Sequence, residues 1–380
     1  MRVLTTERWE HITPCRLPAY SYAEFLKAVS KFPAFCGEKG PNGNAANLSD
    51  DDMCLKEIAA LFAHIDENSG GNSSTGCPAG RALPGTPVDT WRQGLYYTKE
   101  IACDVASPTS NCDYFSTSFG NDVNYPRTSS ATKYFGRGSI MLSWNYNYGG
   151  FSKALFGDHA VLLNDPERVA TEGWIAFSSA LWVYMTPRNM TPSMHSVIAG
   201  FWKPNSADAS AGFKAGFGAT ITIKNSGCGS NPVIASTHFT NLLKYFNVAV
   251  DISESVSCNT ASSVFPILGT AGTSYVFFDN DWSNPGRCKL VNYGTSFSMF
   301  TPGDYKRCVC FYQGPCDLKP QASSCFAYQA NFNYLPGDFV CDASSMWKCE
   351  VQPTALTCKT EMPQASGSGV AWKKVSFSIN

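Results

Sequence analysis

The sequence has little charge of either sign and no long apolar run. Charged residues make up 16% of the 380 residues, and 29 Lys and Arg against 30 Asp and Glu leave a formal net charge of -1. Nucleic acids and anionic membranes attract basic surfaces, so neither is an expected partner. No segment approaches the roughly 18 consecutive apolar residues of a membrane-spanning helix. The composition therefore argues against a nucleic-acid-binding or membrane-spanning protein.

Signatures of several enzyme classes are also missing. The five histidines show no HExxH spacing, and no Gly-x-Ser-x-Gly segment is present. Gly136 and Gly138 are not followed by the Lys-Ser/Thr pair of a phosphate-binding loop. His64 falls on an expected helix and is interpreted as a partly buried structural residue. We therefore expect no metal ion and no cofactor.

The 16 cysteines do not form paired CxxC zinc motifs. An even number of cysteines in a Gly- and Pro-rich chain is typical of disulfides formed on a secretory route. Three Asn-x-Ser/Thr sequons, at Asn47, Asn72 and Asn189, agree with this route. The first fifteen residues contain no apolar segment of a signal peptide, and we expect that such a peptide has been removed. The sequence therefore predicts a secreted, extracellular protein.

The cysteines and the hydrophobic periodicity divide the chain near residues 250–262. Eight cysteines lie at or before Cys258 and eight after it, so each part could close its own disulfides. The first part has helical periodicity at 23–32 and 54–67, and a third helix is expected to open at 165–167. After Cys258, short β-prone runs alternate with turn signals. We expect helices joined by long loops, then small β modules that need disulfides for stability.

Two acidic residues of the first part are candidates for acid and base chemistry. Hydrolysis of a glycosidic bond needs two carboxyl groups, one on each face of the sugar. Glu67 ends the helix expected at 54–67 and leads into a Gly-rich loop, and Glu100 lies between aromatic residues and Cys103. The alternative is that Glu67 is a solvated helix-end residue and that Glu100 belongs to an ion pair.

A longer motif favours the chemical interpretation. Residues 134–149 read YFGRGSIMLSWNYNYG. This segment resembles the YYGRGPIQLSxNYNYG signature of glycoside hydrolase family 19, the chitinases with a helical, lysozyme-like fold. Segments 20–35, 58–71, 164–187 and 192–229 resemble other parts of the family in the same order. The resemblance covers residues 18–258.

The resemblance implies a role for individual residues. Glu67 takes the place of the general acid, Glu100 that of the general base, and Ser143 that of the residue that helps the base to hold the attacking water. The mechanism is inverting, which requires carboxyl groups about 6.5–9.5 Å apart. Expected sugar contacts are Ser69, Tyr134, Tyr146, Asn147 and Asn225. The resemblance also implies the disulfides Cys103–Cys112 and Cys228–Cys258.

Several positions depart from the family pattern. Asp66 stands where the family has His or Ser, and Met141 stands where it has Gln. The acidic residue expected just before Cys228 is missing, and His238 replaces the Arg that pairs with it. We hypothesise that the charge of Asp66 raises the pKa of Glu67. The segment between the two glutamates is longer than expected, with additional loop around residues 72–90.

The C-terminal residues contain a second resemblance. Residues 326–350, followed by GVAWKKV, resemble carbohydrate-binding module families 5 and 12. The aromatic residues that match are Tyr328, Tyr334, Trp347 and Trp372. Exposed aromatic rings can stack on pyranose rings, but the same residues could instead form the core of a small β module.

The predicted fold class is α+β and multidomain. A mainly α-helical, lysozyme-like, bilobal catalytic domain is followed by small disulfide-rich β modules. The expected domains are an N-terminal extension (1–17), the catalytic domain (18–258), a β-rich region of unknown type (259–320) and a chitin-binding module (321–380). The predicted function is that of a monomeric, secreted endochitinase acting on chitin or chitooligosaccharides. The alternatives are a non-catalytic chitin-binding protein and a lysozyme-like peptidoglycan hydrolase.

Overall fold

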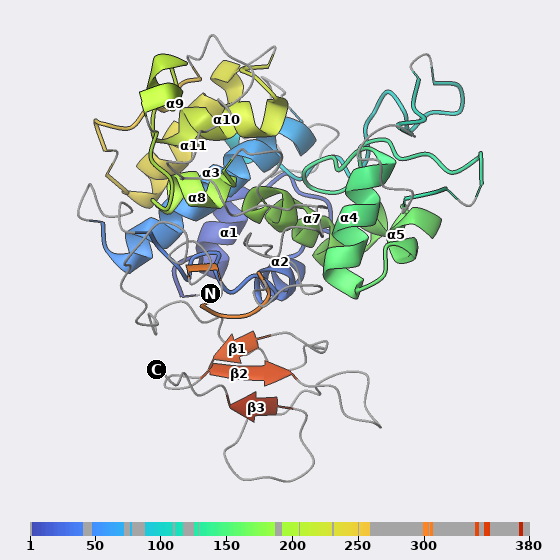
Figure 1. Cartoon of the computed structure of the whole chain (residues 1–380), viewed down its shortest axis with the longest axis horizontal. Coiled ribbons are helices and arrows are strands. Elements are labelled where there is room, and N and C mark those ends of the chain that lie inside the picture. The colour runs from blue at the N-terminus through green and yellow to red at the C-terminus, as the bar shows by residue number, and fades with distance from the viewer. Residues whose placement is uncertain are drawn as a thin grey trace.

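Figure 1 shows the computed structural model of the chain. It describes residues 2–40, 48–71, 77, 88–108, 111–116, 125–127, 129–186, 192–204, 206–229, 232–249, 251–258, 299–303, 305–306, 339–341, 346–349 and 372–374. The asparagines of the three sequons and two of the tail aromatics, Tyr328 and Tyr334, lie outside these residues. No helix within the described ranges is long and apolar enough to cross a membrane.

Helix α3 (Asp50–Ser69) is the central element of the fold. The Ser49 hydroxyl accepts a hydrogen bond from the backbone N–H of Asp52. Three aspartates in the first turn stabilise the helix, because their negative charges lie at the positive end of its dipole. Every residue from 53 to 66 is buried, so α3 is enclosed on all sides. It packs against α7 (Gly173–Met185), α8 (Met194–Ile198) and α11 (Pro232–Phe246). This enclosure gives the end of α3 a rigid position.

The N-terminal residues belong to the same hydrophobic core. Trp9 of α1 (Thr6–Ile12) is fully buried. Its ring lies 5.3 Å from that of Phe25 on α2 (Tyr22–Val29), 5.8 Å from that of Phe62 and 5.9 Å from that of Phe177. Residues assigned to an extension by the sequence analysis therefore contribute to the helical body.

The third expected helix is divided in two. α6 (Arg168–Thr171) is followed by Glu172, whose backbone is extended, and α7 begins at Gly173. A Cβ at position 173 would lie 2.0 Å from the carbonyl oxygen of Ala19, so only glycine allows this approach. The Glu24 carboxylate accepts the N–H of Trp174 at 2.7 Å and satisfies the first turn of α7. One face of α7 is buried in the core, through Trp174, Phe177, Leu181 and Tyr184.

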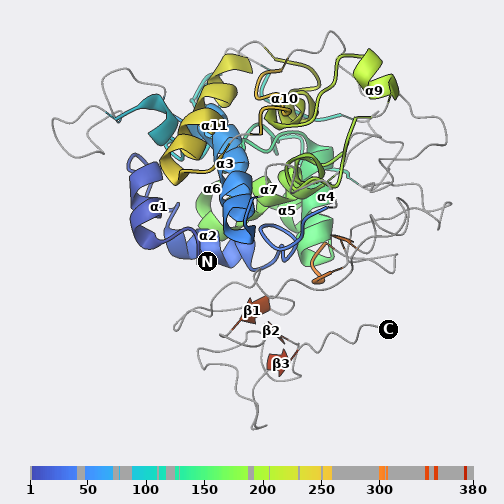
Figure 2. The same cartoon turned by 90° about the vertical axis from the view of Figure 1, so that its left-hand side faces the viewer.

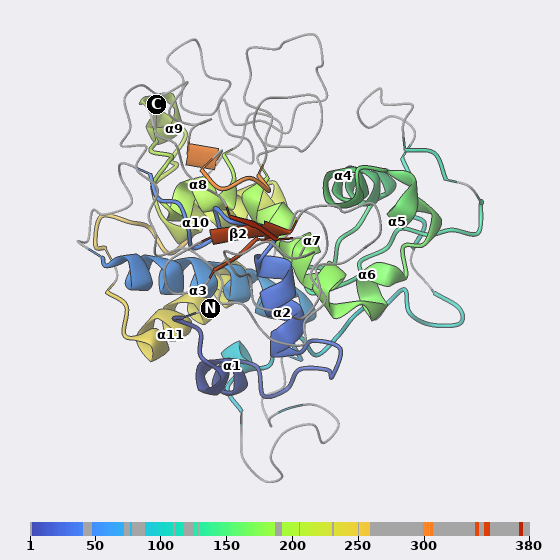
Figure 3. The same cartoon turned by 90° about the horizontal axis from the view of Figure 1, so that it is seen from below.

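The remaining helices lie in two groups on opposite sides of α7. Figures 1 and 3 show α4 (Asn145–Phe156) and α5 (Ala160–Asn164) on one side and α8, α10 (Phe217–Asn225) and α11 on the other. Figure 2 shows α9 (Ser206–Ser210) at the edge of the second group. A short 3-10 helix, η2 (Thr90–Arg92), packs against α3 and α11.

Residues 299–306 return to this helical body. Met299 and Tyr305 are buried in its core, and the Tyr305 hydroxyl lies 2.6 Å from the Ser193 Oγ and 2.5 Å from the Ser196 Oγ. The Glu38 carboxylate accepts backbone N–H groups from residues 303 and 306. The helical body therefore does not end at the expected boundary of residue 258.

Disulfides tie the loops of the first part together. They join Cys15 to Cys77, Cys36 to Cys54, Cys103 to Cys112 and Cys228 to Cys258. The last two are the pairs that the family resemblance implies. All eight cysteines up to residue 258 are thus paired among themselves.

The described strands lie near the C-terminus. β1 (Phe339–Cys341), β2 (Met346–Cys349) and β3 (Trp372–Lys374) form an antiparallel sheet in the order β1-β2-β3. The register pairs Trp347 with Lys374 and Cys349 with Trp372. Two of the predicted tail aromatics are therefore on adjacent strands.

Replacement of Tyr305 by Phe tests the attachment of residues 299–306. The change removes the hydroxyl that hydrogen-bonds two buried serines, which keep only their bonds to each other, so we expect the free energy of unfolding to fall by about 1–3 kcal/mol. Thermal denaturation measures the effect, with Tyr245→Phe as the control because Tyr245 is half-buried against His11. Equal melting temperatures for the two variants would contradict the attachment.

Candidate active site

Glu67 lies in the last turn of α3, beside three basic residues. Its side chain is 15% exposed, and Oε2 lies 3.3 Å from Nζ of Lys224 on α10 and 3.8 Å from Nδ1 of His64. Burial alone would raise the pKa of Glu67, but His64 and Lys224 outweigh burial and lower it to about 2. The Glu67 carboxyl group is therefore ionised at neutral pH in the ligand-free protein.

His238 of α11 is the third basic residue. It is 2% exposed, and burial lowers its pKa to about 4 although Glu67 acts to raise it. This position, at which the sequence lacks the expected Arg, therefore faces Glu67. At neutral pH, however, His238 is uncharged and cannot replace an arginine as a cation.

Glu100 is held by two hydrogen-bond donors. Oε1 accepts from the Tyr114 hydroxyl at 2.9 Å, and Oε2 accepts from the Gly136 N–H at 3.1 Å. Burial and then the nearby Glu100 raise the pKa of Tyr114 to about 12, so this hydroxyl remains a donor at neutral pH. The Glu100 side chain is half-exposed, so one carboxylate is both oriented and accessible.

Ser143 and Glu100 flank the same glycine. A Cβ at position 136 would lie 3.3 Å from the Ser143 Oγ and 3.4 Å from the Glu100 Cβ. The Ser143 hydroxyl donates to the Met141 carbonyl oxygen at 3.0 Å, which leaves its oxygen able to accept a hydrogen bond. Two of the three predicted catalytic residues are thus adjacent.

A buried arginine holds the 134–149 motif in place. The Arg137 guanidinium donates to the Glu167 carboxylate at 2.7 Å and to the Phe135 carbonyl oxygen at 3.0 Å. Backbone hydrogen bonds join residue 100 to residue 136 and residue 138 to residue 98. Because these bonds fix both segments, the orientation of Glu100 depends on the motif.

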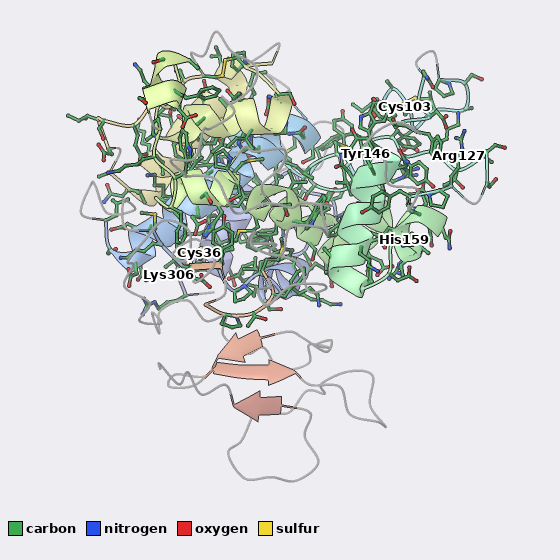
Figure 4. The ribbon with its side chains drawn as sticks, viewed as in Figure 1. Cys36, Cys103, Arg127, Tyr146, His159 and Lys306 are labelled. Carbon is green, nitrogen blue, oxygen red and sulfur yellow. A yellow bond between two sulfur atoms is a disulfide. The ribbon has the colours of Figure 1, made fainter. Side chains whose placement is uncertain are left out.

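An aromatic group extends the site beside Glu100. Trp144 is 37% exposed, and its backbone has a φ of 77°, which is rare for a large residue. Its ring lies 5.3 Å from Tyr114 and stacks on Tyr146 at 5.9 Å with an interplanar angle of 19°. Asn147 donates from its amide to the Ser143 carbonyl oxygen at 2.8 Å. Figure 4 shows Tyr146 on the side of the molecule formed by α4.

Ser69 joins the two predicted catalytic segments. Its hydroxyl accepts the N–H of Leu95, and its carbonyl oxygen accepts the N–H groups of residues 96 and 97. The segment that leads to Glu100 is therefore hydrogen-bonded to the end of the helix that carries Glu67.

Two expected sugar contacts are corrected by the structure. Ser69 is fully buried, and its hydroxyl donates to the carbonyl oxygen of Ile65. Tyr134 is also fully buried and donates to the carbonyl oxygen of Leu163 at 3.0 Å. Both hydroxyls hold the backbone, so neither side chain is placed to contact a ligand.

The sequence reasoning missed three residues. Tyr114 holds Glu100, Trp144 occupies the unspecified position of the motif, and Lys224 directly precedes Asn225 at the end of α10. Lys224 also donates to the Asn225 Oδ1 at 3.3 Å, so this predicted sugar contact lies beside Glu67. Of these three, only Trp144 had a usable signal, as a large aromatic residue inside the motif.

Asp66 does not have the role expected of it. It is 1% exposed, and neither carboxylate oxygen has a hydrogen-bond partner among the described residues. A Cβ at position 94 would lie 1.6 Å from its Oδ1, so the carboxyl packs on Gly94. Burial raises its pKa well above the ordinary value, and the carboxyl is driven toward its neutral form. The hypothesis that a negative Asp66 raises the pKa of Glu67 is therefore wrong.

Among the described residues, no group of three or more His, Cys, Asp or Glu side chains is placed to hold a metal ion.

The buried Asp66 predicts how stability depends on pH. A carboxyl whose pKa is raised by folding binds more protons when folded, so the free energy of unfolding falls as the pH rises above 3.8, its ordinary pKa. Asp66→Asn removes this titration, and we expect its melting temperature to exceed that of the wild type by more at pH 7 than at pH 4. The exposed Asp158→Asn is the control; a gain that does not vary with pH would contradict the prediction.

Comparison with known proteins gives the family. The family model for chitinase class I of glycoside hydrolase family 19 matches residues 4–252. Endochitinase 1 of Theobroma cacao is 37% identical over 212 residues, which are 55% of this chain and 55% of that protein. Inactive chitinase-like protein 1 of Hevea brasiliensis is 36% identical over 230 residues, 59% of this chain and 62% of that one. The chain thus matches little more than half the length of these relatives.

Solved structures give a further comparison. Chitinase C from Streptomyces griseus is 24% identical, with a TM-score of 0.46, over 67% of this chain and 97% of that chain. The family model, by contrast, covers well over half of the sequence and includes Glu67, Glu100 and the 134–149 motif. The protein belongs to glycoside hydrolase family 19, the class I chitinases.

Proposed function

We propose that the protein is a secreted endochitinase that hydrolyses β-1,4 bonds between N-acetylglucosamine units with inversion. The observation that carries the proposal is a pair of carboxyl groups in contrasting surroundings. Glu67 is mostly buried among basic residues, and Glu100 is half-exposed between two neutral donors. Relatives named endochitinases support the substrate class.

The two carboxyl groups would have opposite tasks in this reaction. Glu67 in its protonated form donates a proton to the glycosidic oxygen as the bond from that oxygen to the anomeric carbon breaks. Glu100 takes a proton from the water that attacks the anomeric carbon on the opposite face. Ser143, next to Gly136, accepts a hydrogen bond from that water and helps to orient it.

The substrate contacts in this proposal come from two sides. Trp144 and Tyr146 offer aromatic surface beside Glu100, and Asn147 and Asn225 offer amide groups. Aromatic rings stack on the apolar faces of sugars, whereas amides hydrogen-bond hydroxyl and N-acetyl groups. Trp347 and Trp372, with the two tail tyrosines, would hold a monomeric enzyme on insoluble chitin and raise the local substrate concentration.

The second candidate function is chitin binding without catalysis. A general acid must carry a proton at the working pH, but the cationic surroundings of Glu67 favour its ionised form. A relative named as an inactive chitinase-like protein is 36% identical to this chain. The ion pair between Glu67 and Lys224 is therefore the observation that favours this alternative.

Proton NMR of a short chitin oligosaccharide during digestion separates the two functions. We expect early appearance of the α-anomer, and a loss of about 10²–10⁴-fold in rate for Glu67→Gln and for Glu100→Gln, because each removes one proton-transfer group. Chitin that the protein binds but never cleaves, between pH 3 and pH 8, would establish the binding protein instead. Turnover of bacterial cell wall in place of chitin would establish a peptidoglycan hydrolase.

Trp144→Ala tests the aromatic surface. Loss of one stacking ring is worth about 0.5–1.5 kcal/mol, so we expect KM for the oligosaccharide to rise about 2- to 12-fold with a smaller effect on kcat. Trp144→Phe retains a ring at the same position and should restore most of the affinity. An unchanged KM in Trp144→Ala would remove this residue from the substrate site.

A further inference from the structure

The side chain of Lys224 connects the proposed acid with a proposed sugar contact. Lys224 is 12% exposed, and its Nζ lies 3.3 Å from the Glu67 Oε2 and 3.3 Å from the Asn225 Oδ1. The ammonium comes from α10, whereas Glu67 comes from α3. A buried charge without a partner is costly, so Lys224 and Glu67 stabilise each other's ionised forms.

The hydrogen bond between His64 and Thr220 fixes the tautomer of neutral His64. The Thr220 hydroxyl donates to the carbonyl oxygen of Phe217, so it can only accept from the His64 Nε2. His64 therefore carries its proton on Nε2 when neutral, and a bare Nδ1 faces Glu67. Burial lowers the pKa of His64, whereas the neighbouring Glu67 acts to raise it.

Burial favours the neutral forms of two further ionisable groups near Glu67. His238 of α11 is buried and neutral near pH 7, and Asp66 is a buried carboxyl that packs on Gly94. The Lys224 ammonium is the cation that donates a hydrogen bond to the Glu67 carboxylate. Burial lowers the pKa of Lys224, and the Glu67 carboxylate opposes that change.

We propose that Lys224 is a positioning residue that holds Glu67 as a carboxylate in the ligand-free protein, and that the substrate must separate the two side chains before Glu67 can act as an acid. This inference rests on the proposed chitinase function. The separated carboxylate takes a proton from solvent and then transfers it to the glycosidic oxygen. Asn225 links this step to binding, because Lys224 donates to its Oδ1, so that a sugar that displaces Asn225 displaces the Lys224 ammonium with it.

The pH dependence of kcat/KM for a chitin oligosaccharide tests the proposal, because this ratio reports ionisation of the free enzyme. In the wild type, kcat/KM should fall as the pH rises above the low pKa of Glu67, and this falling part of the pH profile is the limb that the variants test. Lys224→Met removes the positive charge, and we expect this limb to move up by about 1–3 pH units, with a higher rate near pH 7. Lys224→Arg keeps the charge and should keep the wild-type limb, and the exposed Lys203→Met controls for loss of a remote charge.

A structural role for Lys224 gives a different result. If Lys224→Met lowers the rate equally at all pH values without moving the limb, the proposal is overturned. Lys224→Gln, which keeps a polar side chain, provides a second uncharged variant if Lys224→Met fails to fold. A limb that moves equally in Lys224→Arg would also overturn the role of the charge.

A measurement without turnover separates this proposal from the proposed function. Carbon NMR of protein labelled at the glutamate carboxyl groups gives the titration of Glu67, assigned by the signal that Glu67→Gln lacks. We expect the midpoint to rise by about 1–3 pH units in Lys224→Met. An unchanged midpoint would overturn the role of Lys224 even in an active chitinase, and a raised midpoint would support it even if no substrate is cleaved.

Discussion

The contact between the Lys224 ammonium and the Glu67 carboxylate is the interaction on which the proposed chemistry depends. It places a positive charge 3.3 Å from the group that must lose its own proton to the substrate. In the ligand-free protein this contact favours the wrong protonation state for an acid. A chitinase with this arrangement must couple proton uptake to binding, whereas a chitin-binding protein has no such requirement.

The rest of the fold gives this pair a fixed position. Glu67 ends a helix that is enclosed on all sides, and Ser69 bonds that helix end to the segment that leads to Glu100. Arg137 then holds the motif against which Glu100 and Ser143 are placed. The two segments that carry the proposed catalytic groups are therefore held by hydrogen bonds of both backbone and side chains. The partly exposed Trp144 ring packs against Tyr114, which holds Glu100, and its backbone has a φ of 77°.

Local patterns predicted much of this structure, and long-range contacts account for what they missed. The periodicity at 54–67 located α3, and the 134–149 motif brought Ser143 next to Glu100, although the roles of both remain proposals. The break between α6 and α7 depends on the approach of Ala19 to Gly173, and burial of Tyr305 depends on serines more than a hundred residues away. Lys224 precedes Asn225 on α10, and no local signal shows that it reaches α3. Adjacent residues such as Asp66 and Glu67 point in different directions on a helix, which is why their charges could not be combined from the sequence.

A crystal structure of Glu100→Gln with an N-acetylglucosamine tetramer would test the account most directly, because the weakened base leaves the sugar chain uncleaved. We expect that a sugar bond lies against Glu67, that Asn225 contacts the sugar, and that Lys224 no longer contacts the Glu67 carboxylate. A bound tetramer with Lys224 and Glu67 still paired as in the free protein would contradict it.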